Sequence, residues 1–363
     1  MFYHLFYPLS KYFFIFNIFR YITFRSACAF IMSFVIVMFF FKKAVKRLKS
    51  LKMEERVDMY GHLHLEALHE DKEGTPTMGG ILIIYAVVLS SLLWGRWNSV
   101  FIWYSVFVIL SLGLVGLRDD FLKIKRGKGL RRKEKLFFQI IIGIILGVML
   151  IFTNNFPLTL NIPFFKKIIL DLGQFCYFYI FWVVLVLVSS SNAVNFTDGL
   201  DGLAVGTVVI NSFVFVVLSY IAGHIDFSRY LFLPYIKDAG ELSIFCASIG
   251  GAGLGFLWFN SYPAQIFMGD VGALSLGGSI GAVSLFIKEE FLLIIAGGIF
   301  VIEALSVLLQ ILAVKICKKK IFKAAPLHHH LQLLGWSESK IVIRLWIVGI
   351  IFAVFALMSL KIR

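Results

Sequence analysis

Charged side chains are scarce in this chain. Only 15% of its 363 residues are Asp, Glu, Lys or Arg, and 60% are hydrophobic. Soluble domains carry about a quarter charged residues and less than about half apolar ones. The shortage of charge excludes an ordinary soluble domain and predicts an integral membrane protein.

Cysteine is rarer still. The four cysteines, Cys28, Cys176, Cys246 and Cys317, show no paired spacing. A disulfide framework or a cysteine-based metal site is therefore not expected. We interpret the four residues as packing residues.

Ten apolar runs are each long enough for a helix to cross a bilayer, which takes about 20 residues. They cover residues 22–41, 77–95, 99–117, 136–153, 173–191, 204–222, 240–258, 271–287, 291–314 and 341–360. Residues 1–21 precede them as a retained amphipathic segment, and residues 154–172 are compatible with a small hairpin. No loop is long enough to form a core of its own. We therefore expect one all-α polytopic membrane domain over residues 1–363, with ten spans.

The excess of positive charge is confined to particular loops. The loops at 42–76, 118–135 and 315–340 hold eight, nine and six Lys or Arg, whereas the loops on the opposite side hold one or two each. Basic loops remain in the cytoplasm. This distribution predicts a membrane protein with both termini periplasmic, and it does not favour nucleic acid as a partner of the +14 chain.

A polar stretch interrupts the apolar runs at residues 192–204. It contains Asn195, Asp198 and Asp201 together with two glycines. Carboxylates at the membrane edge are costly and usually functional. On a helical turn the two aspartates, three positions apart, would share one face. The alternative is an ordinary polar connecting loop.

Residues 74–80, Gly-Thr-Pro-Thr-Met-Gly-Gly, open the second run. Pro76 suits a helix start and Thr75 can cap it. The amides of such a helix start favour phosphate, and Lys72 adds a positive charge just before it. A simple helix start is the alternative.

Two adjacent carboxylates, Asp119 and Asp120, follow the third run. They repel each other, so either a cation lies between them or one retains its proton. Both states suit catalysis, as metal ligand or general base. Alternatively, they are interfacial acids neutralised by the Lys and Arg that follow. Arg118 beside them is expected to strengthen their ionisation.

Asp270 follows Gly269 at the start of the eighth run. Magnesium uses one or two carboxylates plus substrate phosphates, which predicts Asp270 as a Mg²⁺ ligand. Phe267 is a candidate for stacking on a planar base, with a membrane anchor as the alternative reading.

Three consecutive histidines, His328, His329 and His330, lie in the last basic loop. On a helix they point in different directions, which argues against a zinc site and favours imidazoles facing a phosphate. Glu303 and Gln310 are seven positions apart and share a helix face, and Glu303 should face protein or a cavity.

Carboxylates, lysines, histidines and a helix start at one face of a membrane protein suit phosphoryl transfer to a lipid phosphate. An ion-coupled transporter that uses Glu303 is the alternative from another class. Transporters favour midplane charges and internal repeats. Here the acids crowd one face and no repeat is evident.

These motifs resemble those of the polyprenyl-phosphate N-acetylhexosamine-1-phosphate transferases, and most closely their phospho-N-acetylmuramoyl-pentapeptide branch. The matching stretches run in the family's order from about residue 70 to the C-terminus. They are 74–80, 119–120, 195–203, 267–273, 325–330 and 335–346. Residues 57–68, in contrast, match poorly. The triple histidine separates this branch from the GlcNAc-1-phosphate branch, which stays as the alternative.

The resemblance implies transfer of phospho-MurNAc-pentapeptide from its UDP carrier to undecaprenyl phosphate, giving lipid I and UMP with Mg²⁺. It implies a homodimer in the bacterial inner membrane with a cytoplasmic active site. In the family's direct mechanism the lipid phosphate attacks after Asp119 takes its proton, and in the other an aspartate is first phosphorylated. We favour direct attack, because a phosphate oxygen is already anionic near neutral pH.

The resemblance also implies a role for each site residue. Asp270 binds Mg²⁺, and Asp119 and Asp120 serve the lipid-phosphate nucleophile. The other expected substrate-binding residues are Lys72, Thr77, Asn195, Asp198, Asp201, Asn260, Phe267 and Gln310, mainly on the nucleotide side, and Lys123, Lys135, His328, His329 and His330, near the sugar phosphate.

Overall fold

Long apolar helices dominate the structure, a computed structural model that describes residues 1–54, 72, 74–162, 170–173 and 176–361. Within this part of the chain, nine helices are long and apolar enough to cross a membrane. They are α2 (Ile22–Ser50), α5 (Val100–Arg126), α6 (Arg132–Ile151), α7 (Cys176–Thr197), α8 (Leu203–Ala222), α10 (Leu242–Asn260), α11 (Gly269–Phe286), α13 (Gly298–Cys317) and α15 (Glu338–Ser359). The predicted class, an all-α polytopic membrane protein, is confirmed. The poorly matching residues 57–68 lie outside the described residues.

The remaining predicted span, 77–95, is the shorter helix α4 (Gly80–Trp94). Its 15 residues extend only about 22 Å, less than the roughly 30 Å of a bilayer core. The helix packs against α2 and α10. It is therefore partly covered by protein rather than by lipid alone.

Short elements connect the long helices. The predicted hairpin is present as β1 (Thr159–Leu160) paired antiparallel with β2 (Leu170–Asp171). The segment before α2 forms short helices without buried residues. The short helices are α1 (Phe2–Phe6), η1 (Tyr7–Lys11), η2 (Phe14–Arg20), α9 (Ile225–Tyr230), η5 (Ala239–Glu241), α12 (Glu290–Ala296) and α14 (Leu327–Gln332).

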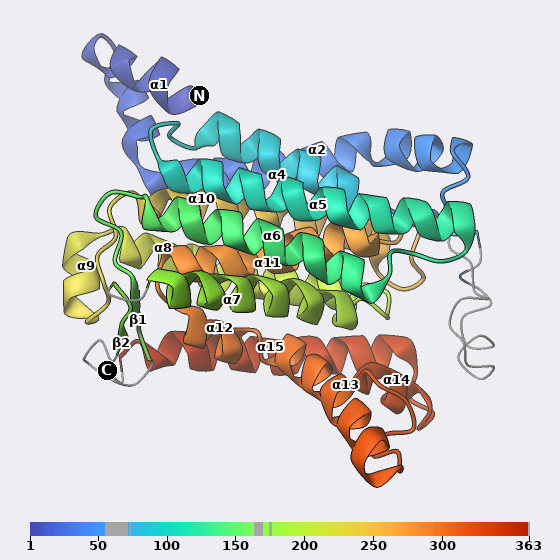
Figure 1. Cartoon of the computed structure of the whole chain (residues 1–363). Coiled ribbons are helices and arrows are strands. Elements are labelled where there is room, and N and C mark those ends of the chain that lie inside the picture. Colours follow the sequence, from blue (N-terminus) through green and yellow to red (C-terminus); the bar gives the residue numbers. More distant parts are fainter. Residues whose placement is uncertain (55–71, 73, 163–169, 174–175, 362–363) are drawn as a thin grey trace.

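The expectation of one continuous span over residues 291–314 is wrong. The chain forms two helices there, α12 and α13, which are separated at Gly297. Glycine lowers helix propensity, and the next residue, Gly298, lies where a Cβ would approach the Phe352 ring to 2.6 Å. Figure 1 shows α13 running away from the bundle after this break.

Two helices form the centre of the bundle because small residues let backbones approach closely. In α10, a Cβ on Gly251 would lie 2.1 Å from the carbonyl oxygen of Phe30 in α2. In α5, a Cβ on Gly116 would lie 2.3 Å from the carbonyl oxygen of Asp270 in α11. This packing buries α11 and fixes its first turn, which carries Asp270, against α5.

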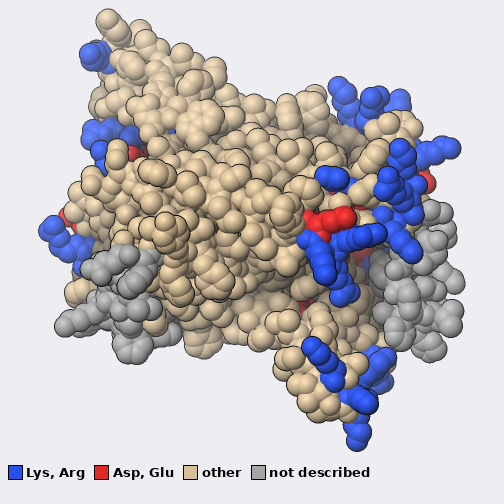
Figure 2. All heavy atoms as spheres, viewed as in Figure 1, with Lys and Arg blue, Asp and Glu red and all other residues tan. Residues whose placement is uncertain are grey.

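The two ends of the bundle differ in charge. Helix α1 and the C-terminal end of α15 lie at the same end (Figure 1). Lys and Arg side chains gather at the opposite end, around a group of carboxylates (Figure 2). At the end with the termini, a buried Arg25 pairs with Glu241 through two bonds of 2.7 Å. The candidate site therefore lies at the basic end.

Candidate active site

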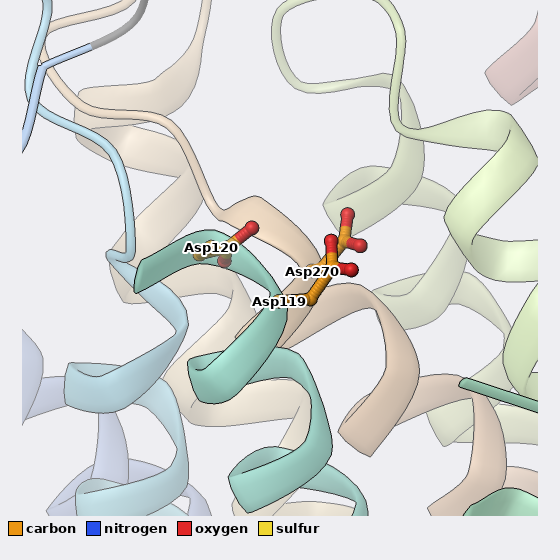
Figure 3. Close-up of side chains that lie close together, drawn as sticks. All are labelled: Asp119, Asp120 and Asp270. Atoms are coloured by element: carbon orange, nitrogen blue, oxygen red, sulfur yellow. The ribbon is translucent and has the colours of Figure 1, made fainter. Parts of the chain in front are cut away.

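Three carboxylates from two helices meet at the basic end of the bundle (Figure 3). Asp119 and Asp120 lie near the end of α5, which continues to Arg126 beyond the predicted end of the span at residue 117. Asp270 lies in the first turn of α11. Oxygen atoms from all three carboxylates lie within 4.8 Å of one another. The structure thus brings together the three aspartates expected to carry out catalysis.

Two lysines lie among these carboxylates. The Lys123 ammonium is 2.8 Å from Asp119 Oδ2, 3.3 Å from Asp120 Oδ1 and 3.0 Å from Asp270 Oδ1. Lys135 pairs with Oδ2 of Asp270 and lies 3.8 Å from Asp119 Oδ2. Three carboxylates against two ammonium groups leave one net negative charge when all are ionised. Such a site can accept a further cation.

Backbone amides hold two of the three carboxylates in place. Leu130 N donates to Asp119 Oδ1 at 2.8 Å, and Val271 N donates to Asp120 Oδ2 at 3.1 Å. The oxygens of Asp270 face the Lys123 and Lys135 ammonium groups, and its side chain is the most exposed of the three, at 14%. Asp270 is therefore the carboxylate most accessible to a metal that arrives from solvent.

The donor set fits Mg²⁺. Mg²⁺ prefers carboxylate and phosphate oxygens and retains water. The Lys123 ammonium lies among the three carboxylates, so a cation is already favoured there, and it would have to move aside. Arg118, expected to strengthen the ionisation of the acidic pair, lies instead over the Phe138 ring, 5.3 Å from its centroid. That expectation is wrong, because the two lysines take this role.

A cavity of about 370 Å³ opens beside the carboxylates. Most of the predicted site residues line it: Lys72, Thr77, Asp120, Lys123, Asn195, Asp198, Asp201, Asn260, Phe267, Asp270, His328 and His329. Asp119 and Lys135 join this set through their ion pairs. The motifs, far apart in sequence, therefore form one polar cavity.

Asp198 and Asp201 do not share a helical face, contrary to the expectation. Helix α7 ends at Thr197, and the chain turns through Gly202, whose φ is +76°. Both aspartates line the cavity. Asp201 also connects two other segments of the chain. Its Oδ1 accepts from the Lys72 ammonium at 2.7 Å, and its Oδ2 accepts from Ala264 N at 3.0 Å.

Glu338, at the start of α15, completes this contact and was not predicted from the sequence. Its Oε1 accepts from the Lys72 ammonium at 2.7 Å and from the Asp201 backbone amide at 2.7 Å. In the sequence it is only an acidic residue after Ser337, typical of a helix start. No local pattern indicates that this helix start reaches the 198–202 turn.

Comparison with known proteins places the chain in a family. A family model described as glycosyl transferase family 4 matches residues 102–288, and a phospho-N-acetylmuramoyl-pentapeptide-transferase signature matches residues 72–84. The chain is 47% identical to the phospho-N-acetylmuramoyl-pentapeptide-transferase of Desulfotalea psychrophila and 45% identical to that of Citrifermentans bemidjiense, with 100% of each chain covered. The chain belongs to the phospho-N-acetylmuramoyl-pentapeptide-transferase family. This confirms the predicted transferase and not its GlcNAc-1-phosphate alternative.

The family signature at residues 72–84 includes the start of α4, which differs from the expected anion site. The helix begins at Gly80 without a side-chain cap from Thr75, and Pro76 lies before it. Gly79 N donates to Phe267 O at 2.8 Å, and Gly80 N donates to Met268 O at 2.9 Å. Because these amides are already bonded, the expectation that they bind phosphate is wrong.

Close packing explains why Gly80 of this signature is a glycine. A Cβ on Gly80 would lie 2.2 Å from the backbone nitrogen of Gly272 in α11. The signature thus holds α4 against the first turn of the helix that carries Asp270.

Asn260 connects two segments that line the cavity. Its Oδ1 accepts from Gly202 N at 3.1 Å, and its Nδ2 donates to Ile266 O at 2.8 Å. It therefore positions the 198–202 turn and the segment before Phe267. The Phe267 ring lines the cavity, and its centroid lies 5.9 Å from the Lys72 ammonium.

The three histidines have three different surroundings, as helical geometry predicts. His328 is fully buried, with Nδ1 3.2 Å from Oε2 of Glu303, which as expected faces protein. His329 lines the cavity, and its Nδ1 lies 2.8 Å from Gln332 Oε1. His330 does not line the cavity, and its Nδ1 accepts from Lys323 N at 3.1 Å.

Gln310, expected on the nucleotide side, does not line the cavity. Its Oε1 accepts from the amides of Ile321 and Phe322 at 3.1 and 3.0 Å, and its Nε2 donates to Phe322 O at 3.0 Å. The amide therefore fixes the loop after α13. The break at Gly297 directs α13 away from the bundle, which accounts for this displacement.

Proposed function

We propose that the protein transfers phospho-MurNAc-pentapeptide from its UDP carrier to undecaprenyl phosphate, forming lipid I and UMP in a Mg²⁺-dependent reaction. Relatives matched over 100% of both chains carry the name of this transferase. The observation that carries the proposal for this chain is the convergence of three carboxylates and two lysines beside one polar cavity.

The two lysines hold the reacting phosphates in this proposal. Phosphoryl transfer depends on positioning and on neutralising charge. Lys123 and Lys135 lie on both sides of Asp270, so their ammonium groups can release a carboxylate and bind a phosphate oxygen. Asp119 faces both lysines through Oδ2, and with Asp270 assigned to the metal it is the proposed acceptor of the proton from the lipid phosphate. The proposed step is direct attack of that phosphate.

Asp270 is the proposed magnesium ligand, with Asp119 or Asp120 completing the carboxylate set. When bound, Mg²⁺ would neutralise the diphosphate of the nucleotide substrate. This assignment of Asp270 is supported by a donor set made only of carboxylate oxygens and by the exposure of the Asp270 side chain.

The nucleotide lies towards Lys72 and Phe267 in this proposal. An aromatic ring can stack on a planar base, and an ammonium group beside the ring can donate to the carbonyl oxygens of that base. Asp201 and Asn260 hold the surrounding backbone. The lipid phosphate then approaches from the end of α5. The homodimer implied by the resemblance stays a prediction.

We infer that the catalytic end faces the cytoplasm of a bacterial inner membrane. Its support is the basic loops at this end and the termini at the other (Figures 1 and 2). Cys317 is exposed near the tip of α13 and provides a test. A membrane-impermeant thiol reagent should label it only after cells are permeabilised. Labelling of Cys317 in intact cells would contradict this orientation.

The decisive experiment measures UMP release and labelled lipid with purified protein in nanodiscs. UDP-MurNAc-pentapeptide should yield labelled lipid and UDP-GlcNAc should not. Asp270→Asn should lower turnover by roughly 100-fold or more. Asp226→Asn, an exposed aspartate at the end with the termini, is the matched control and should retain activity. If the Asp270→Asn variant kept normal turnover after a chelator had removed Mg²⁺, the proposed role of Asp270 as a metal ligand would be contradicted.

A further inference from the structure

A second cavity lies outside the catalytic site. It is a groove of about 740 Å³ between the C-terminal part of α2 and the first half of α4. It shares no lining residue with the catalytic cavity. The carboxylates and lysines of the candidate active site therefore do not account for it.

One end of the groove is apolar. Phe40 and Ala44 of α2 face Leu82 and Tyr85 of α4 across it. The Phe40 and Tyr85 rings meet edge to face, with centroids 6.1 Å apart. Together these side chains form a floor that suits a hydrocarbon chain.

The other end is basic. Lys43, Lys46 and Arg47 line it, all three are exposed, and their spacing of three and four places two of them on one face with Phe40. Among the residues that the structure describes, no carboxylate lies within 4.0 Å of these three side chains. They differ in this respect from the catalytic lysines, which are held by aspartates.

We propose that this groove binds an anionic diacyl phospholipid. The phosphate headgroup lies against Lys43, Lys46 and Arg47, and an acyl chain lies along the floor made by Phe40 and Tyr85. Arginine suits this headgroup because its guanidinium can donate two parallel bonds to a phosphate. A soluble anion would make no use of the floor, and a zwitterionic lipid would not match three basic side chains.

The groove also contacts the catalytic segment through the backbone. Met78 and Gly79 line it, and Gly79 N donates to Phe267 O at 2.8 Å. A lipid in the groove therefore rests on residues that bond directly to the segment ending at Asp270. This proposal concerns binding alone, and it does not depend on the transfer reaction.

Photolabelling in nanodiscs tests the proposal on the full chain. Phosphatidylglycerol with a photoactivatable acyl chain should label peptides from α2 and α4 that line the groove, as mapped by mass spectrometry. Labelling at matched lipid concentration should be at least several-fold weaker with phosphatidylcholine. Each Lys or Arg near an anionic headgroup contributes on the order of a fivefold change in affinity.

Two triple variants separate the groove from general surface charge. K43Q/K46Q/R47Q should lose most of the labelling. K42Q/K49Q/K52Q removes the same charge from exposed side chains of the same segment that do not line the groove, and it should retain labelling. Equal losses in both variants would overturn the proposal, because the effect would then be a nonspecific surface field.

A third variant tests the floor. Ala44→Phe fills the groove without changing charge, so it should reduce labelling while an unchanged Tm shows that the fold is retained. Unchanged labelling would place the lipid elsewhere and overturn the proposal. Displacement of the label by a polyprenyl phosphate but not by unlabelled phosphatidylglycerol would also overturn it, since the groove would then be a substrate site.

Discussion

The Lys72 ammonium donates to Oδ1 of Asp201 at 2.7 Å, although the two residues are 129 positions apart in the chain. Lys72 opens the family signature and Asp201 belongs to the turn after α7. Their contact closes one side of the cavity beside the three carboxylates. Glu338 adds the start of α15 to the same contact, so three distant segments depend on one ammonium group.

Glu338→Ala should weaken binding of the nucleotide substrate. The change removes one of the two carboxylate acceptors of Lys72 and the acceptor of the Asp201 amide, and a hydrogen bond to a charged group contributes about 1.5–3 kcal/mol. We expect KM to rise by roughly tenfold or more with a smaller change in kcat. Glu338→Gln keeps an acceptor oxygen and should lie between the two. Steady-state UMP release measures both constants, and an unchanged KM in the alanine variant would refute the role.

Lys123→Met should remove turnover and strengthen the response to Mg²⁺. Methionine keeps an unbranched apolar stem without the ammonium group, and it leaves three carboxylates with Lys135 alone. We expect turnover to fall by roughly 100-fold. The Tm increase on adding Mg²⁺ should be larger than in the unmodified protein, because no ammonium group competes for the carboxylates. Differential scanning fluorimetry measures this shift.

The control for this variant is Lys128→Met in the loop that follows. Lys128 is exposed and has no ion pair among the described residues. It should keep both turnover and the original Mg²⁺ response. If Lys128→Met and Lys123→Met lose equal activity, general positive charge rather than the carboxylate contact determines the rate.

Gly80→Ala should destabilise the protein and lower its activity. The added Cβ would meet the Gly272 backbone, which cannot move without displacing α11 and Asp270. Overpacking of this kind costs about 1–3 kcal/mol. Gly349→Ala is the matched control, because its nearest neighbours would be side-chain atoms at 3.5 and 3.6 Å. Thermal unfolding should separate the two variants, and equal Tm values would contradict the proposed helix contact.

Local patterns in the sequence predicted the spans and the acidic groups of the site. Apolar runs of sufficient length must form helices in a bilayer, because backbone polar groups have no other partner there. Asp119, Asp120 and Asp270 follow or begin such runs at the same face, so their meeting could be expected from the number of spans.

Other features depend on contacts between segments and could not be predicted. The break at Gly297 interrupts a run that remains apolar throughout, so hydropathy gives no indication of it. The amides of Gly79 and Gly80 have an ordinary helix-start sequence but bond to residues 267 and 268. Glu338 likewise has the local sequence of an ordinary helix start but bonds to Lys72 and to the Asp201 amide. In each case the partner lies more than a hundred positions away or in another helix.

The three histidines predict a graded series in which each alanine variant is a control for the others. His328→Ala removes the imidazole from the buried Glu303 carboxylate and keeps only the weaker contact from the residue 328 backbone amide, at 3.4 Å, so it should lower Tm by about 2 °C or more and reduce turnover. His329→Ala should fold normally but lose substrate affinity, since this ring lines the cavity. His330→Ala should stay within roughly twofold of the unmodified protein, because a lost bond from Lys323 N costs about 1 kcal/mol and touches no substrate. Tm values and UMP release rates test the order, and it is wrong if His330→Ala is the most impaired.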